Sequence, residues 1–211
     1  MDTATTPKFF SADAISALFG PVQAPTAIEI FETSRARLAD AKLAPIEMFD
    51  RFANRLPTDG TPFLLVPPQP KAVNNLDWTD LMARIELNGK VGQNYLAVGS
   101  LLDLDPIVSV QRMLVGLEDG RGRLNTKPSV SEANITAAGR FGYTVWTGYI
   151  HVVVFTEVLN HHYMDLIRSR CDSVCVPGLC LHDDEPTLSA FWVDDAYPFW
   201  GAPSFGSVIE N

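Results

Sequence analysis

The sequence lacks the features that would place it in a membrane or on nucleic acid. Apolar runs such as 152–155 are far shorter than the roughly 20 residues that a membrane-spanning helix needs. The net charge is −9, and the basic residues are scattered instead of forming a stripe that could follow a phosphate backbone. The first residues show no apolar stretch of signal-peptide length and no small-residue cleavage site. We therefore expect a cytoplasmic protein with neither a nucleic-acid nor a membrane partner.

Motifs that commit a chain to one reaction are missing as well. There is no Gly-x-x-x-x-Gly-Lys-Ser/Thr loop, no Gly-x-Gly-x-x-Gly after a strand and no Gly-x-Ser-x-Gly elbow. The chain has 3 cysteines, and no two of them form the Cys-x-x-Cys pair of redox proteins. These absences weaken nucleotide-binding, serine-hydrolase and redox interpretations.

The composition is that of a folded globular protein. The 211 residues are 46% hydrophobic and 19% charged, which are ordinary values for a chain that buries a core. We expect a flexible polar tail at 1–8 and a single α+β domain at 9–211. Within that domain, 9–60 is predicted to contain a helical hairpin and 108–206 to be rich in strands.

The helices of the first part are predicted from their ends. A short helix is expected at 11–20. Thr26 and Glu29 form a capping-box pattern, in which side chains satisfy free backbone amides, and the helix should continue to about Lys42. Another long helix should begin at Pro45, because apolar residues then repeat on one face. They are Phe49, Phe52, Ala53 and Leu56.

The middle of the chain mixes both kinds of element. Prolines after 63–66 restrict that short strand candidate to a sheet edge or a loop. Asp77 precedes apolar residues at helical spacing, and Asn88 with Gly89 is the expected end of that helix. The clearest strand is 108–118.

The last part is predicted to be mainly β. Ser129 and Glu132 resemble a second capping box, for a helix that stops at Gly139. Further strands are expected at 164–168, 174–181 and 187–193, with a turn at 182–186. Helices early and strands late predict an α+β fold, with a helical N-terminal part packed on a mainly antiparallel sheet from the C-terminal half. Segment 143–155 is ambiguous, because its β-branched residues favour a strand by propensity.

Spaced residues of the second half resemble the pattern of the mainly actinobacterial domain-of-unknown-function family 5701. The likeness is clearest over 110–206. The residues that carry it include Met113, Gly139, Arg140, Gly148, Val176, Pro177, Leu188 and Trp192. The resemblance implies no particular reaction, cofactor or partner. It does imply that 143–159 is a helix entered at Thr144, and we adopt that prediction over β-propensity.

The chain also departs from this family pattern near its end. The family has Asn-Pro-His followed by an aromatic residue where this chain has Asp195, Ala196 and Tyr197. Phe191 replaces the cysteine expected before the last-strand tryptophan. The cysteines of this chain lie where the family pattern has none.

Those cysteines and a nearby histidine are of the types that bind zinc. Cys171, Cys175, Cys180 and His182 lie close in sequence, but their spacing does not match two zinc knuckles. Cys175 and Cys180 should lie on opposite faces of one strand unless a bulge reunites them. We therefore favour buried, apolar cysteines and expect no cofactor. The alternative is a zinc site that includes Cys180, His182 and Asp183.

The C-terminal segment is rich in aromatic residues beside carboxylates. Most of these rings are expected in the core, but aromatic walls beside carboxylates also form ligand pockets. Strand alternation places Trp192 and Asp194 on one face. Our ligand-binding candidates are Trp192, Asp194, Tyr197, Trp200 and Arg170, of which Arg170 supplies positive charge next to Cys171.

Together these observations predict a binding or protein-interaction protein without a catalytic signature. Its partner would be a protein or a small-molecule ligand, and self-association through an apolar helix face stays open. The alternative is a metal-dependent, hydrolase-like enzyme that uses a C-terminal cluster. Its residues would be Cys180, His182, Asp183 and Asp194.

Overall fold

A computed structural model describes residues 25–97 and 99–210 of the chain. The tail expected at 1–8 and the helix expected at 11–20 lie outside these ranges. The fold is mixed α+β, as predicted, with helices first and mainly antiparallel strands later. Within the same ranges, no helix is long and apolar enough to cross a membrane.

The two helices at the start confirm one prediction in full and another in part. In α2 (Ala27–Asp40), Thr26 and Glu29 make the predicted capping box, with the Glu29 amide 3.2 Å from Thr26 Oγ1. The second helix, η1 (Ile46–Arg55), is a 3₁₀-helix and not an α-helix. With three residues per turn, the fully buried rings of Phe49 and Phe52 lie on one face of this helix.

A three-stranded antiparallel sheet lies next to these helices. Its order is β1 (Phe63–Val66), β6 (Arg112–Val115) and β14 (Ser207–Ile209). The edge position predicted for 63–66 is confirmed. The strand predicted at 108–118 is wrong in extent, because β6 covers only the residues that pair with β1.

The helix predicted after Asp77 is shorter than expected. Asp77 caps α3 (Trp78–Met82), but the helix ends before Asn88. Asn88 and Gly89 instead form the two-residue turn between β2 (Glu86–Leu87) and β3 (Lys90–Val91), with φ angles of 54° and 79°. Asn-Gly is the preferred sequence for such a turn, and here that preference prevails over the helical pattern.

The main sheet of the C-terminal half has five strands. Their order is β12 (Trp200–Gly201), β8 (Tyr163–Asp165), β10 (Cys175–His182), β11 (Glu185–Trp192) and β4 (Gln93–Asn94). β10 and β11 form the predicted hairpin, and β8 pairs antiparallel with β10. The edge strands β12 and β4 run parallel to their neighbours. The strand predicted at 164–168 is shorter than expected, because β8 ends at Asp165. Ser169–Arg170 forms a separate strand, β9, which pairs with β5 (Leu102–Asp103).

Smaller elements connect the two sheets. The predicted helix α4 (Pro128–Ala137) forms, but its cap residue is Lys127 and not Ser129, because Pro128 occupies the first helical position. A short ladder joins β7 (Phe141–Gly142) to β13 (Ser204–Phe205). The remaining 3₁₀ segments are η2 (Val73–Asn75), η3 (Arg121–Arg123) and η4 (Thr156–Asn160).

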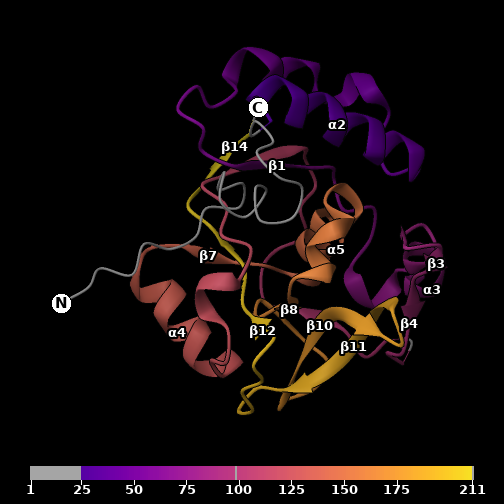
Figure 1. The fold of residues 1–211 in the computed structure, drawn as a ribbon, viewed down its shortest axis with the longest axis vertical. Helices are drawn as coiled ribbons and strands as arrows, with labels where there is room; N and C mark the ends of the chain where they lie inside the picture. Colours follow the sequence, from indigo (N-terminus) through magenta and orange to yellow (C-terminus); the bar gives the residue numbers. More distant parts are fainter. Residues whose placement is uncertain (1–24, 98, 211) are drawn as a thin grey trace.

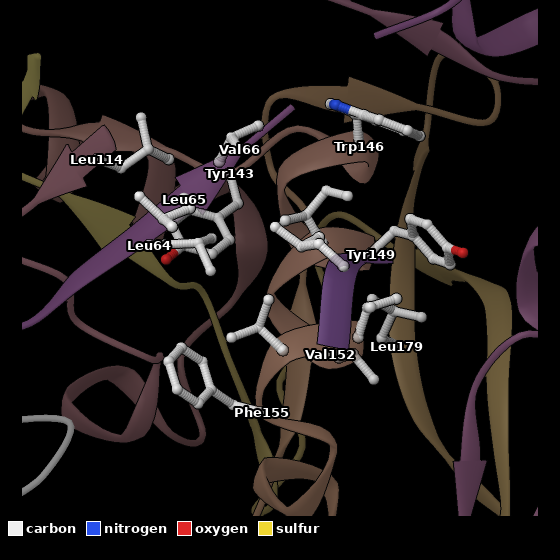
Figure 2. Close-up of a cluster of buried hydrophobic side chains, with 14 of the residues drawn as sticks. Leu64, Leu65, Val66, Leu114, Tyr143, Trp146, Tyr149, Val152, Phe155 and Leu179 are labelled. Atoms are coloured by element: carbon white, nitrogen blue, oxygen red, sulfur yellow. The ribbon is translucent and has the colours of Figure 1, made fainter. Parts of the chain in front are cut away.

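Helix α5 (Val145–Val154) is the centre of the molecule, and all of its residues are buried. Figure 1 shows α5 in the middle, with α2 and β1 on one side and the β10–β11 hairpin on the other. Thr144 caps the helix by accepting a hydrogen bond from the Thr147 amide, as the family resemblance implied, but the α-helix ends at Val154 and not at 159. Around α5, apolar side chains of β1, β6 and β10 form one cluster (Figure 2). Burial on every side favours these apolar residues in a helix despite their β-propensity.

Candidate ligand-binding surface

The two faces of the β10–β11 hairpin have different surroundings. Leu179 and Leu188 are paired across the hairpin and belong to the core cluster around α5. Because strand side chains alternate, Gly178 and Cys180 face the other way. We call this second side the outer face of the main sheet.

Three aromatic rings from different strands meet on the outer face over Gly178. A Cβ atom at Gly178 would lie 2.5 Å from Cζ3 of Trp200 and 2.9 Å from Cδ2 of Phe191. The ring centroids of Phe191 and Trp200 are 3.8 Å apart, and those of Tyr163 and Trp200 are 5.2 Å apart. The absence of a side chain at Gly178 therefore provides the space that Trp200 fills.

A buried carboxyl lies beside these rings. Asp165 is directly opposite Gly178 in the β8–β10 ladder, so its side chain is on the same outer face. Asp165 is only 2% exposed. No described residue donates a hydrogen bond to its carboxyl or forms an ion pair with it, and burial raises the pKa of Asp165 to about 7. A buried carboxyl without a partner is uncommon in proteins and often marks a functional site.

Other aromatic rings project into solvent where the hairpin opens. Trp192 is 58% exposed, Tyr197 40% and Phe199 64%. The carboxylates between them are held in place. Asp194 Oδ1 accepts a hydrogen bond from Ser129 Oγ at 2.8 Å, and Asp195 accepts one from Tyr197 Oη at 3.1 Å. We call Trp192, Tyr197, Phe199, Asp194 and Asp195 the aromatic–acidic surface.

The structure places the five predicted ligand-binding residues in two different situations. Trp192 ends β11, Asp194 and Tyr197 lie in the loop that follows, and Trp200 begins β12. Of these, Trp200 is buried and the other three are exposed. Arg170 is instead occupied, because its guanidinium donates to Glu132 at 2.6 Å and to two backbone carbonyls. Its charge holds α4 against β9.

The residues proposed for zinc do not form a closed site. Cys180 is buried on the outer face, whereas His182 is exposed and packs edge-on against Tyr95. Asp183 belongs to the hairpin turn, and its carboxylate is 3.9 Å from His182 Nε2. Over 25–97 and 99–210, no group of three or more His, Cys, Asp or Glu residues could hold a metal ion.

The four residues of the hydrolase alternative are spread over the length of the hairpin. His182 pairs with Glu185 next to the turn, whereas Asp194 follows Trp192 at the opposite, open end. Strands of this length separate those ends by roughly 20 Å. The ladder from Cys175 to His182 is continuous, so no bulge brings Cys175 and Cys180 to one face.

Sequence reasoning missed Asp165 and a group of buried histidines. The only sequence signal for Asp165 is a lone acid inside an apolar strand, in register with Tyr163. His162 is 1% exposed, and burial lowers its pKa. Its Nε2 donates to the Asp119 carbonyl at 2.6 Å. Nearby, Tyr143 and His151 contact each other at 3.1 Å between Oη and Nδ1, so this cluster joins core elements.

A polar groove of about 850 Å³ lies elsewhere, between the end of α2, α3 and η4. Its arginines are already paired with groove residues. Arg37 Nη2 is 2.9 Å from Glu157 Oε1, and Arg84 bonds to Asp80. These two arginines are therefore already engaged within the groove.

Comparison with known proteins identified no relative of this chain. No family model, no curated protein and no solved structure matches this chain. The resemblance seen in the sequence therefore stays a prediction, and the functional argument depends on the site itself.

Proposed function

We propose that this chain is a cytoplasmic, non-enzymatic protein that binds a basic segment of a partner protein. The contact would be the aromatic–acidic surface at the open end of the β10–β11 hairpin. The observation that carries the proposal is the exposure of Trp192, Tyr197 and Phe199 within eight positions of the chain.

Exposed aromatic rings of this kind are what protein interfaces use as anchors. Trp and Tyr are enriched among the residues that contribute most binding energy, because each buries a large rigid area. The hydrogen bonds of Asp194 to Ser129 and of Tyr197 to Asp195 hold the loop in one conformation. An ordered surface loses less conformational entropy when a partner binds.

The charge around this surface indicates the chemistry of the partner. Residues 171–200 contain no lysine or arginine, whereas Asp172, Asp194 and Asp195 are exposed near the rings. Carboxylates attract lysine and arginine side chains, and the faces of exposed rings attract them as well. A segment that combines basic and apolar residues is therefore the complementary partner.

Selection of displayed random peptides against the full chain tests this proposal. We expect enriched peptides to combine Lys or Arg with an apolar residue. Binding of a selected peptide should weaken about tenfold or more in Trp192→Ala, as for an interface anchor.

Ile28→Ala is the matched control, because Ile28 is 67% exposed but lies on α2. The proposal is wrong if the selected peptides are acidic, or if Trp192→Ala and Ile28→Ala bind them equally well.

A further inference from the structure

We propose that Asp165, together with the rings of Trp200, Phe191 and Tyr163, receives an alkylammonium group from the partner, such as a lysine side chain. This inference rests on the proposed function: the site is separate from the aromatic–acidic surface, the loop 194–199 joins that surface to Trp200, and the inference names the group that the partner would insert. Asp165 would supply the negative charge, and the rings would surround the aliphatic part and the cation. We call these four residues the Asp165 site.

The first step of the argument is that the four side chains share one space. Asp165 and Gly178 are directly opposed, so the side chain of Asp165 and the missing Cβ of Gly178 point to the same side. The rings of Trp200 and Phe191 lie within 2.9 Å of that missing Cβ position. Tyr163 is two residues before Asp165 on β8 and therefore projects to the same side.

The second step is that this space lacks a cation. Burying a charge costs several kcal/mol unless a partner compensates it. Asp165 has no hydrogen-bonding or ionic partner among the described residues, and desolvation by burial is what raises its pKa to about 7. A ligand cation would provide the missing charge, and aromatic faces add to its attraction.

The third step separates an alkylammonium group from a guanidinium group. A guanidinium has five N–H donors in a planar fork and is best satisfied by several acceptors. The Asp165 site offers one carboxylate among rings, so most of those donors would stay unpaired. An ammonium has three donors, and a methylated ammonium has fewer still, which suits an aromatic surrounding.

The tyrosine and cysteine groups near this site stay uncharged near neutral pH, and the charge of Asp184 in the hairpin turn also acts on Tyr163. Burial is the main cause that raises the pKa of Tyr163 on β8, and burial raises the pKa of Cys180 on β10 to about 12. Hydrogen bonding to Asp195 is the main cause that raises the pKa of Tyr197, and the charge of Asp165 contributes too. Asp195, whose carboxyl group accepts this hydrogen bond, is exposed. Ser189 and Phe191 of β11 and Trp200 of β12 do not titrate.

The loop 194–199 is the route by which a ligand would reach this site. All of its residues are exposed. It is held by backbone bonds from Trp200 to Tyr197 (3.1 Å) and from Tyr163 to Phe199 (2.7 Å). Since Tyr197 is close enough to Asp165 to feel its charge, we expect the Tyr197 ring to move when a cation enters.

Calorimetric titration of the full chain with Nα-acetyl-lysine N-methylamide and its Nε-trimethyl form tests the inference. Because only ionised Asp165 attracts the cation and its pKa is about 7, affinity should be about tenfold weaker at pH 6 than at pH 8. The corresponding arginine derivative should bind more weakly than either. Titration with choline tests whether the site prefers a free small ammonium compound to a lysine side chain. If choline binds more tightly than the trimethyl-lysine derivative, the assignment to a partner side chain is wrong.

Two variants test whether Asp165 is the residue that binds the cation. Asp165→Asn should lose the binding, whereas Glu86→Gln, which removes an exposed acid on β2 outside both binding surfaces, should keep the tenfold pH dependence. Circular dichroism and urea unfolding establish that both are folded, and the pH dependence of the wild-type chain tests the inference without any variant. Undetectable binding of the lysine derivatives, or binding that is independent of pH, overturns it. In that case, peptide binding that still depends on Trp192 would leave the proposed function intact.

Discussion

The inner and outer faces of the main sheet bury polar atoms in two different ways. On the inner side, Tyr149 of α5 donates its hydroxyl to the Leu81 carbonyl at 2.9 Å, and Trp146 donates to the Pro67 carbonyl at 3.2 Å. On the outer side, Asp165 has no described partner although it is equally inaccessible. The buried polar atoms of Tyr149 and Trp146 are thus satisfied, as stability requires. The outer face retains a destabilising group, which is more typical of sites that bind something.

Trp146→Ala tests the inner face and should give the largest loss of stability. Trp146 is 1% exposed, and its removal would leave a large cavity beside β1. We expect the free energy of unfolding to fall by about 3–5 kcal/mol, measured by urea denaturation. A loss below about 1 kcal/mol would show that the cluster around α5 is not the main source of stability.

Asp165→Asn tests the outer face through the pH dependence of stability. In the folded chain the pKa of Asp165 is about 7, above the 3.8 of an unperturbed aspartate. The folded state therefore keeps a proton that the unfolded chain releases. The stabilisation of the folded state by this proton is complete below pH 4 and is lost as the pH rises through 7. Its size is about 4 kcal/mol of unfolding free energy.

We therefore expect that, between pH 4 and pH 8, the free energy of unfolding measured in urea falls more for the wild-type chain than for Asp165→Asn. Asp194→Asn should follow the wild-type curve, because Asp194 is exposed. Parallel curves for wild type and Asp165→Asn would contradict the raised pKa.

Gly178→Ala should have an intermediate effect, because it forces Trp200 and Phe191 away from the outer face. Such overpacking typically costs about 1–3 kcal/mol. Gly206→Ala is the matched control, since its new Cβ would meet no atom closer than 3.5 Å. A change in tryptophan fluorescence that appears only in Gly178→Ala would locate the disturbance at Trp200.

Trp192→Ala should have the smallest effect on stability. Its ring is 58% exposed, so we expect a change within about 0.5 kcal/mol. The same variant is expected to lose peptide binding, and that contrast separates a surface for recognition from a structural residue. A strongly destabilised Trp192→Ala would favour a structural role instead.

The elements that the sequence predicted best are those with local signals. Thr26 and Asp77 cap helices through their own side chains, and the β10–β11 turn uses adjacent aspartates at φ angles of 52° and 64°. Such signals act within a few residues, so they survive in any tertiary context.

Features that depend on distant residues were not predictable in the same way. The α-helical state of 145–154 follows from burial on all sides, which composition alone does not reveal. Asp165 illustrates the limit for the site. Whether an acid inside a strand meets solvent or rings depends on Trp200, which comes much later in the chain and reaches β8 through a parallel pairing.

The connection pattern of the two sheets also determines when each can form during synthesis. The β10–β11 hairpin joins neighbouring residues through a two-residue turn, so it can close as soon as residues 175–192 are made. The sheet of β1, β6 and β14 needs residues 63–66 and 207–209 together. The hairpin can therefore form while the other sheet is incomplete, because local contacts need little loop closure. Pulse-labelled hydrogen exchange should protect Leu179 before Leu114, and the reverse order would refute this sequence of events.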